Sequence, residues 1–161
     1  MDAMRYAYHT DYLLKLPSGH PFPMVKYPLL YANLLRDGVI APGDLIRPVE
    51  ATVDSLSLVH TCEYLELLAT NALDAAAVRT LGVPWSPALW RRSRLAAQGT
   101  LEAARAALED GLAGNLAGGT HHAFPSHGEG FCVLNDVAIA IRVLQREGRI
   151  DRALVIDLDV H

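Results

Sequence analysis

Residues 135–161 read NDVAIAIRVLQREGRIDRALVIDLDVH, and this stretch decides the fold class. Its first half repeats apolar residues at helical spacing and runs into Gly148, a residue that commonly follows a helix end. Residues 153–156, ALVI, form a continuous apolar run, which is typical of a strand buried on both faces of a parallel sheet. We therefore expect a helix over residues 135–147, followed by a central strand over residues 153–156.

The same alternation extends toward the N-terminus. Residues 91–110 repeat apolar side chains at helical spacing and precede Gly111, and residues 115–119 follow as a short strand or strand end. Residues 4–8 fit a first short strand. Helices that alternate with short apolar strands predict an α/β domain, specifically three α/β/α layers around a mostly parallel central sheet.

Composition narrows the class of protein further. A chain of 161 residues with 51% hydrophobic and 20% charged residues suits one globular domain and disfavours disorder. The net charge of −4 without a basic block argues against nucleic acid as a partner. No apolar run reaches the roughly 18 residues of a membrane span, and the first residues lack a signal-peptide core. With only two cysteines, we expect a cytoplasmic protein without a disulfide scaffold.

Residues 157–161, DLDVH, have the chemistry of a metal site. Alternation along an extended chain places Asp157, Asp159 and His161 on one side. Carboxylate and imidazole together suit Zn²⁺, Fe²⁺ or Mn²⁺, and burying two carboxylates without a cation is costly. The alternative is an exposed strand terminus with a solvated pair of aspartates.

Residues 118–122, GGTHH, also follow a predicted strand. Because sites in open parallel sheets form at the carboxyl ends of the strands, we expect GGTHH and DLDVH to meet in one crevice. There, one of His121 and His122 can act as general base toward a metal-bound water and the other as acid, with Asp157 orienting a ring. The alternative is a pair of capping or core histidines.

The loop over residues 124–131 contains Pro125, Gly128 and Gly130, together with His127 and Glu129. Gly130 and Phe131 offer a close backbone approach and then an aromatic wall, which suits the apolar stem of a substrate. A core aromatic is the alternative for Phe131. We expect His60 to be structural, and Asn135 to cap the following helix or to support the site.

Two of these motifs, taken together, are similar to those of a known protein family. Residues 118–136, GGTHHAFPSHGEGFCVLND, with residues 155–161, VIDLDVH, resemble the histone deacetylase superfamily, which has the arginase/deacetylase fold. The likeness runs along essentially the whole chain. HPF at 20–22 and VHT at 59–61 are most similar to the class IV-type branch and its bacterial relatives. The resemblance implies a metal-dependent hydrolase that removes acyl groups from lysine in proteins or peptides, or from similar acylated small amines.

The resemblance also implies a role for each matching residue. Asp159 and His161 would bind Zn²⁺, with Fe²⁺ as the alternative metal. His121 and His122 would be the catalytic histidines, and Asp157 the carboxylate behind His121, where it would also help to hold a structural K⁺.

Substrate binding is implied for four further residues. Two of them, His20 and Phe22, lie near the N-terminus, and the other two are Gly130 and Phe131. Gly130 and Phe131 would line a tunnel for the acyl-lysine side chain, and the Gly130 carbonyl would accept the substrate amide.

Family members continue well beyond the position of His161. We therefore expect residues 1–161 to be the N-terminal half of one domain, truncated after the first zinc-ligand motif and inactive alone. A third aspartate ligand, a carbonyl-polarising tyrosine and a partner behind His122 would lie further on. The alternatives are an acetylpolyamine amidohydrolase, a long-chain deacylase or an arginase-like enzyme of the same fold, and a half-domain that only binds.

Overall fold

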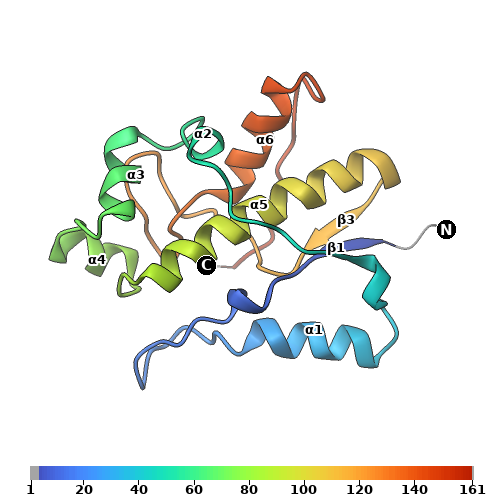
Figure 1. The fold of residues 1–161 in the computed structure, drawn as a ribbon, viewed down its shortest axis with the longest axis horizontal. Helices are drawn as coiled ribbons and strands as arrows, with labels where there is room; N and C mark the ends of the chain where they lie inside the picture. Colours follow the sequence, from blue (N-terminus) through green and yellow to red (C-terminus); the bar gives the residue numbers. More distant parts are fainter. Residues whose placement is uncertain (1–3, 161) are drawn as a thin grey trace.

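A computed structural model describes residues 4–160, and a parallel three-stranded sheet lies at its centre (Figure 1). The strands are β1 (Arg5–Ala7), β2 (Leu45–Ile46) and β3 (Ala113–Asn115), in the order β2-β1-β3. Tyr6 at the centre of β1 is in register with Leu45 on one side and with Gly114 on the other. The α/β class, the parallel sheet and the strand expected within residues 4–8 are confirmed.

The helices differ widely in length. In chain order they are η1 (Thr10–Tyr12), α1 (Lys26–Arg36), η2 (Pro42–Asp44), α2 (Val53–Leu56), α3 (Cys62–Ala69), α4 (Ala75–Leu81), α5 (Pro87–Asp110) and α6 (Asp136–Arg146), where η marks a 3₁₀ turn. Within residues 4–160, none of them is both long and apolar enough to cross a membrane. Figure 1 shows α5 running past the sheet, with α6 on one side of the molecule and α1 on the other, beside η1.

Helix α5 is the scaffold on which the other elements are placed. Ser86 accepts a hydrogen bond from the Leu89 N–H at its first turn, Pro87 occupies the first helical position, and Gly111 ends it with a φ of 87°. Its buried face packs against α6, β3 and β1. The helix expected over residues 91–110 is thus present and begins four residues earlier, at its proline.

The strand expected over residues 153–156 is absent, and this prediction was wrong. These residues have no regular secondary structure and form no ladder with any strand within residues 4–160. Leu154 is 85% exposed and Ile156 is 73% exposed. An apolar run becomes a strand only when neighbouring backbone satisfies its N–H and C=O groups, and the described chain offers residues 153–156 no such neighbour.

Candidate active site

The backbone just before the tandem histidines is held by the first residue of α6. The Thr120 N–H donates to Asp136 Oδ1 at 2.8 Å, and the Thr120 hydroxyl lies 2.7 Å from the same oxygen and 2.5 Å from the Leu134 carbonyl oxygen. Asp136 is only 1% exposed. A buried carboxylate is stable only when it is hydrogen-bonded, so Asp136 and Thr120 fix each other and the start of the histidine pair.

The second oxygen of Asp136 connects this point to α5 and the sheet. The Thr100 hydroxyl on α5 donates to Asp136 Oδ2 at 2.5 Å, and Asn115 at the end of β3 donates from Nδ2 to Thr100 Oγ1 at 2.8 Å. The Tyr12 hydroxyl donates to Asn115 Oδ1 at 3.0 Å, and burial raises the pKa of Tyr12 above its ordinary value. Four elements therefore meet in one partly buried polar network, whose buried side-chain atoms all have partners.

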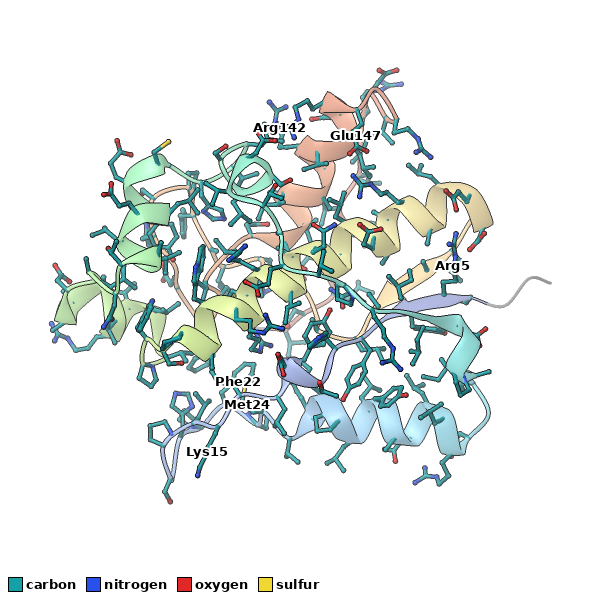
Figure 2. All side chains as sticks on the ribbon, in the orientation of Figure 1. Arg5, Lys15, Phe22, Met24, Arg142 and Glu147 are labelled. Atoms are coloured by element: carbon teal, nitrogen blue, oxygen red, sulfur yellow. The ribbon has the colours of Figure 1, made fainter. Side chains whose placement is uncertain are left out.

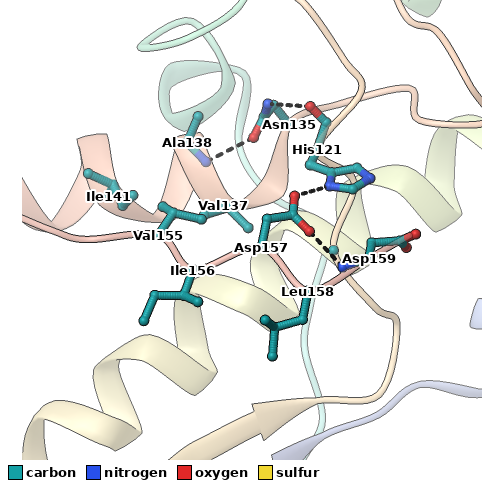
Figure 3. A pocket seen from close by; sticks show the side chains of 11 residues that line it. His121, Asn135, Val137, Ala138, Ile141, Val155, Ile156, Asp157, Leu158 and Asp159 are labelled. Atoms are coloured by element: carbon teal, nitrogen blue, oxygen red, sulfur yellow. Dashed lines mark hydrogen bonds and ion pairs between the residues drawn. The ribbon is translucent and has the colours of Figure 1, made fainter. Parts of the chain in front are cut away.

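Asn135 holds the histidine pair from the other side. Its Oδ1 accepts the Ala138 N–H at 3.0 Å, which makes it the N-cap of α6, and its Nδ2 donates to the carbonyl oxygens of His121 and Ala123 at 3.4 and 3.1 Å (Figure 3). The sequence left capping and support of the site open as alternatives. The structure shows that Asn135 does both.

His60 ties the start of α6 to the loop over residues 124–131. Its Nε2 accepts the Asn135 N–H at 3.0 Å, so the ring proton lies on Nδ1, which donates to the Pro125 carbonyl oxygen at 3.3 Å. His60 is 2% exposed, and burial lowers its pKa because a charged imidazolium would lose its hydration. His60 is therefore a neutral structural histidine, as expected.

The two sequence motifs meet at the tandem histidines. The rings of His121 and His122 have centroids 4.3 Å apart and planes at 84° to each other. His121 Nδ1 is in hydrogen-bond contact with the carboxylate of Asp157, 36 residues further along the chain (Figure 3). The expected meeting of GGTHH and DLDVH is thus present, although the strand that was to bring it about is not.

Asp157 is suited to orient the ring of His121. Its Oδ1 accepts the Asp159 N–H at 2.9 Å while Oδ2 faces His121. The hydrogen bond to His121, and secondly that from Asp159, lower the pKa of the exposed Asp157 carboxyl below its usual range. An ionised carboxylate at Nδ1 keeps the ring proton on that nitrogen and leaves Nε2 as a proton acceptor, as a general base requires.

A cavity of about 660 Å³ opens beside these rings. Both histidines and Asp159 line it, and Phe22 and Phe131 form an aromatic wall with ring centroids 5.1 Å apart. Figure 2 shows Phe22 in the segment before α1, so this wall joins residues from opposite ends of the sequence. A smaller cavity of about 360 Å³ is lined by His121 and Asp157 (Figure 3).

The chain conformation at residues 130 and 131 is adapted to this cavity. Gly130 has a φ of 54°, and a Cβ at this position would lie 3.0 Å from His122 Cγ, so glycine permits the close approach. Phe131 has a φ of 68°, which is unusual for an aromatic residue and marks strained backbone. The expected close approach followed by an aromatic wall is present.

The four residues implied in substrate binding do not all face the cavity. Phe22, Gly130 and Phe131 line it. His20 lies behind the wall, with its ring edge-on to Phe131 at 5.9 Å and its Nε2 2.9 Å from the Gly82 carbonyl oxygen. His20 thus contacts the ring of Phe131 and does not line the cavity, in contrast to its expected role in substrate binding.

Arg92 is a cavity residue that the sequence analysis missed. It is buried on α5, where its Nε donates to the Tyr12 carbonyl oxygen at 2.9 Å and its guanidinium lies 4.8 Å from the Tyr27 ring centroid. A signal was available, because Arg92 follows Leu89 by three positions and precedes Ala96 by four, and so shares their buried face.

The described residues fit only part of a metal site. Asp159 brings a carboxylate to the cavity wall beside His121 and His122, and this is an oxygen ligand that zinc accepts. His161, the other expected ligand, lies outside the described residues. Across residues 4–160 there is no group of three or more His, Cys, Asp or Glu arranged to hold a metal ion.

Comparison with known sequences agrees with this geometry. Residues 20–161 match the model of the histone deacetylase domain. The chain is 47% identical over 154 residues to a protein of Picosynechococcus sp., 34% identical over 152 residues to the acetoin utilization protein AcuC of Bacillus subtilis, and 32% identical over 148 residues to histone deacetylase 2 of Arabidopsis thaliana. These matches cover 96%, 88% and 88% of this chain but 51%, 39% and 38% of the relatives, so the chain spans about half their length or less.

Solved structures show the same relationship. A histone deacetylase homologue in complex with SAHA superposes with a TM-score of 0.76 at 29% identity, over 90% of this chain and 42% of that one. A homologue from Aquifex aeolicus superposes with a TM-score of 0.75 at 28% identity, over 90% and 41%. With this fold, these motifs and a domain match over most of its length, the chain belongs to the histone deacetylase family.

Proposed function

We propose that this protein takes part in the metal-dependent hydrolysis of acylated amines, with acyl-lysine as the substrate class and zinc as the metal. One observation carries the proposal. The Asp157–His121 contact lies beside His122, and both rings face a cavity with an aromatic wall. This arrangement combines a proton acceptor, a neighbouring imidazole and a channel for an apolar stem.

The residues that line the cavity have distinct parts in the proposed reaction. Phe22 and Phe131 flank the aliphatic stem of the substrate, and the carbonyl of Gly130 accepts its amide N–H. His121, oriented by Asp157, and its neighbour His122 take a proton from water and return one to the leaving amine nitrogen.

Asp159 and His161 would hold the metal. Bound zinc would polarise the amide carbonyl and lower the pKa of water to about 7. Histone deacetylase 2 of Arabidopsis thaliana and the histone deacetylase homologue solved with SAHA support the same class of chemistry.

The proposal is tested by replacing His122 in the full-length protein. For hydrolysis of an acetyl-lysine peptide, His122→Ala should lower kcat by about 10²–10⁴, because a positioned acid or base contributes that much. Bound zinc should be retained in His122→Ala and lost in Asp159→Ala. Full turnover by His122→Ala would contradict the catalytic role. Binding of the peptide without hydrolysis by the zinc-loaded wild type would favour a binding module instead.

A further inference from the structure

The ring of Phe131 is held in place by a set of contacts on the chain behind it. The Phe131 N–H donates to the Leu81 carbonyl oxygen at 2.8 Å, which tethers its backbone to the end of α4. The ring meets His20 at 5.9 Å and Phe22 at 5.1 Å between ring centroids. We call His20, Leu81 and Gly82 together the Phe131 cradle.

Gly82 is the point of closest approach in the cradle. It ends α4 with a φ of 77°, and a Cβ at this position would lie 2.9 Å from Phe131 Cε1 and 3.1 Å from Cδ1. Real Cβ contacts are almost never that short, so any side chain at residue 82 would displace the ring. The neighbouring Leu81 tether prevents the backbone of Phe131 from simply moving away.

His20 joins the two chain segments on which this wall depends. Its Nδ1 accepts the Phe22 N–H at 3.1 Å, so the ring proton lies on Nε2, which donates to the Gly82 carbonyl oxygen at 2.9 Å. One imidazole therefore fixes the loop that carries Phe22 to the turn that contains Gly82. Both nitrogens of the ring are used in these structural contacts.

We propose that Gly82 and His20 are positioning residues that fix the ring of Phe131 and so set the width of the cavity for an acylated amine. The consequence for substrate rests on the proposed function above, whereas the mechanical coupling of residues 82 and 131 does not. Displacing the ring would alter the wall beside Phe22, so it would impair substrate binding more than the proton transfers at His121 and His122.

The chain contains a matched control for Gly82. Gly111 also ends a helix in the left-handed region, with a φ of 87°, but a Cβ there would have no atom within 4 Å. Alanine at either position brings the same kind of backbone strain. Only Gly82→Ala adds a collision with Phe131.

In the full-length protein, Gly82→Ala should raise KM for an acetyl-lysine peptide about tenfold with little change in kcat, since overpacking of this kind commonly costs enough for a factor of that size. Gly111→Ala should leave both constants near the wild-type values. An unchanged KM in Gly82→Ala, or an equal rise in both variants, would overturn the proposal.

A second measurement needs no catalysis. Gly82→Ala should lower the melting temperature by more in the wild-type background than in a Phe131→Ala background, where the colliding ring is gone. Equal losses in both backgrounds would contradict the coupling. If Gly82→Ala does not fold, folding of the double variant supports the proposal and its failure to fold overturns it. A wild type that hydrolyses no acylated amine would contradict the proposed function and leave this comparison intact.

The same background tests His20. If His20 acts through the wall, His20→Ala should raise KM in the wild type but add little to the KM of Phe131→Ala. If the two effects multiply, His20 does not act through the ring of Phe131, and its assignment as a positioning residue for that ring is overturned.

Discussion

Residues 118–136 and residues 151–160 bring the two halves of the candidate site together, yet they are held in opposite ways. The first region is fixed by the buried Asp136, by Asn135 and by His60. The second is exposed along its whole length and meets the first through the Asp157–His121 contact. A loop can thus be the rigid part of a site, while an apolar run that resembles a strand is the exposed part.

The difference reflects where the hydrogen-bond partners of each region lie. Three of the bonds that shape the histidine loop join residues 12 to 16 positions apart, and those to His60 and Thr100 span 75 and 36 positions, so all of them are made by side chains within the described residues. A strand instead needs backbone partners from elsewhere in the fold. The first region therefore finds its hydrogen-bond partners within the described residues, whereas residues 153–156 find no partner strand there.

The largest effect is expected from removal of the Asp136 carboxylate. Asp136→Ala leaves the Thr120 N–H and the Thr100 hydroxyl without their buried acceptor, so we expect a loss of about 3 kcal/mol in the free energy of unfolding. Urea unfolding measures this loss. Asp151→Ala, an exposed aspartate of the second region, should change stability by less than about 0.5 kcal/mol. Similar losses in the two variants would contradict the difference between the regions.

A smaller effect on the free energy of unfolding is expected from the protonation of His60, which holds the first region through Asn135. Because burial lowers the pKa of His60 in the folded state, the unfolded chain binds more protons at mildly acidic pH. This contribution to stability is fully present above the unfolded pKa of about 6.5 and is lost as pH falls toward the folded value, at no more than about 1.4 kcal/mol per pH unit.

Unfolding free energies measured from pH 7.5 to 5.0 check this sign. His60→Gln should flatten the decline, whereas His127→Gln, at an exposed histidine, should preserve more of it. The same decline in His60→Gln as in the wild type would show that His60 is not the group responsible.

The smallest effect is expected in the second region. Leu154 is 85% exposed, so Leu154→Ala in this chain should alter the free energy of unfolding by less than about 0.5 kcal/mol. Thermal or urea unfolding is sufficient to detect a difference. A loss of about 2 kcal/mol or more, typical of a buried leucine, would show that residues 153–156 are buried in the core.

The sequence was informative where structure is local. Helical spacing and capping residues predicted α5 and α6, and the two motifs predicted the meeting of His121 with Asp157. It did not reveal the burial of Asp136, because a carboxylate in the first turn of a helix is usually an exposed one that favours the helix dipole. Nor did it reveal Gly82, since its contact with Phe131 joins segments 49 positions apart.

The central claim is that the two regions form one catalytic unit, and a double-mutant cycle between His121 and Asp157 tests it most directly. In the full-length protein, Asp157→Asn should lower kcat/KM for an acetyl-lysine peptide by about 10–100-fold, because the ring of His121 loses its orienting carboxylate. If Asp157 acts through His121, the same substitution should cost almost nothing further in a His121→Ala background. Losses that multiply in the double variant would show that the residues act independently, and would contradict the claim.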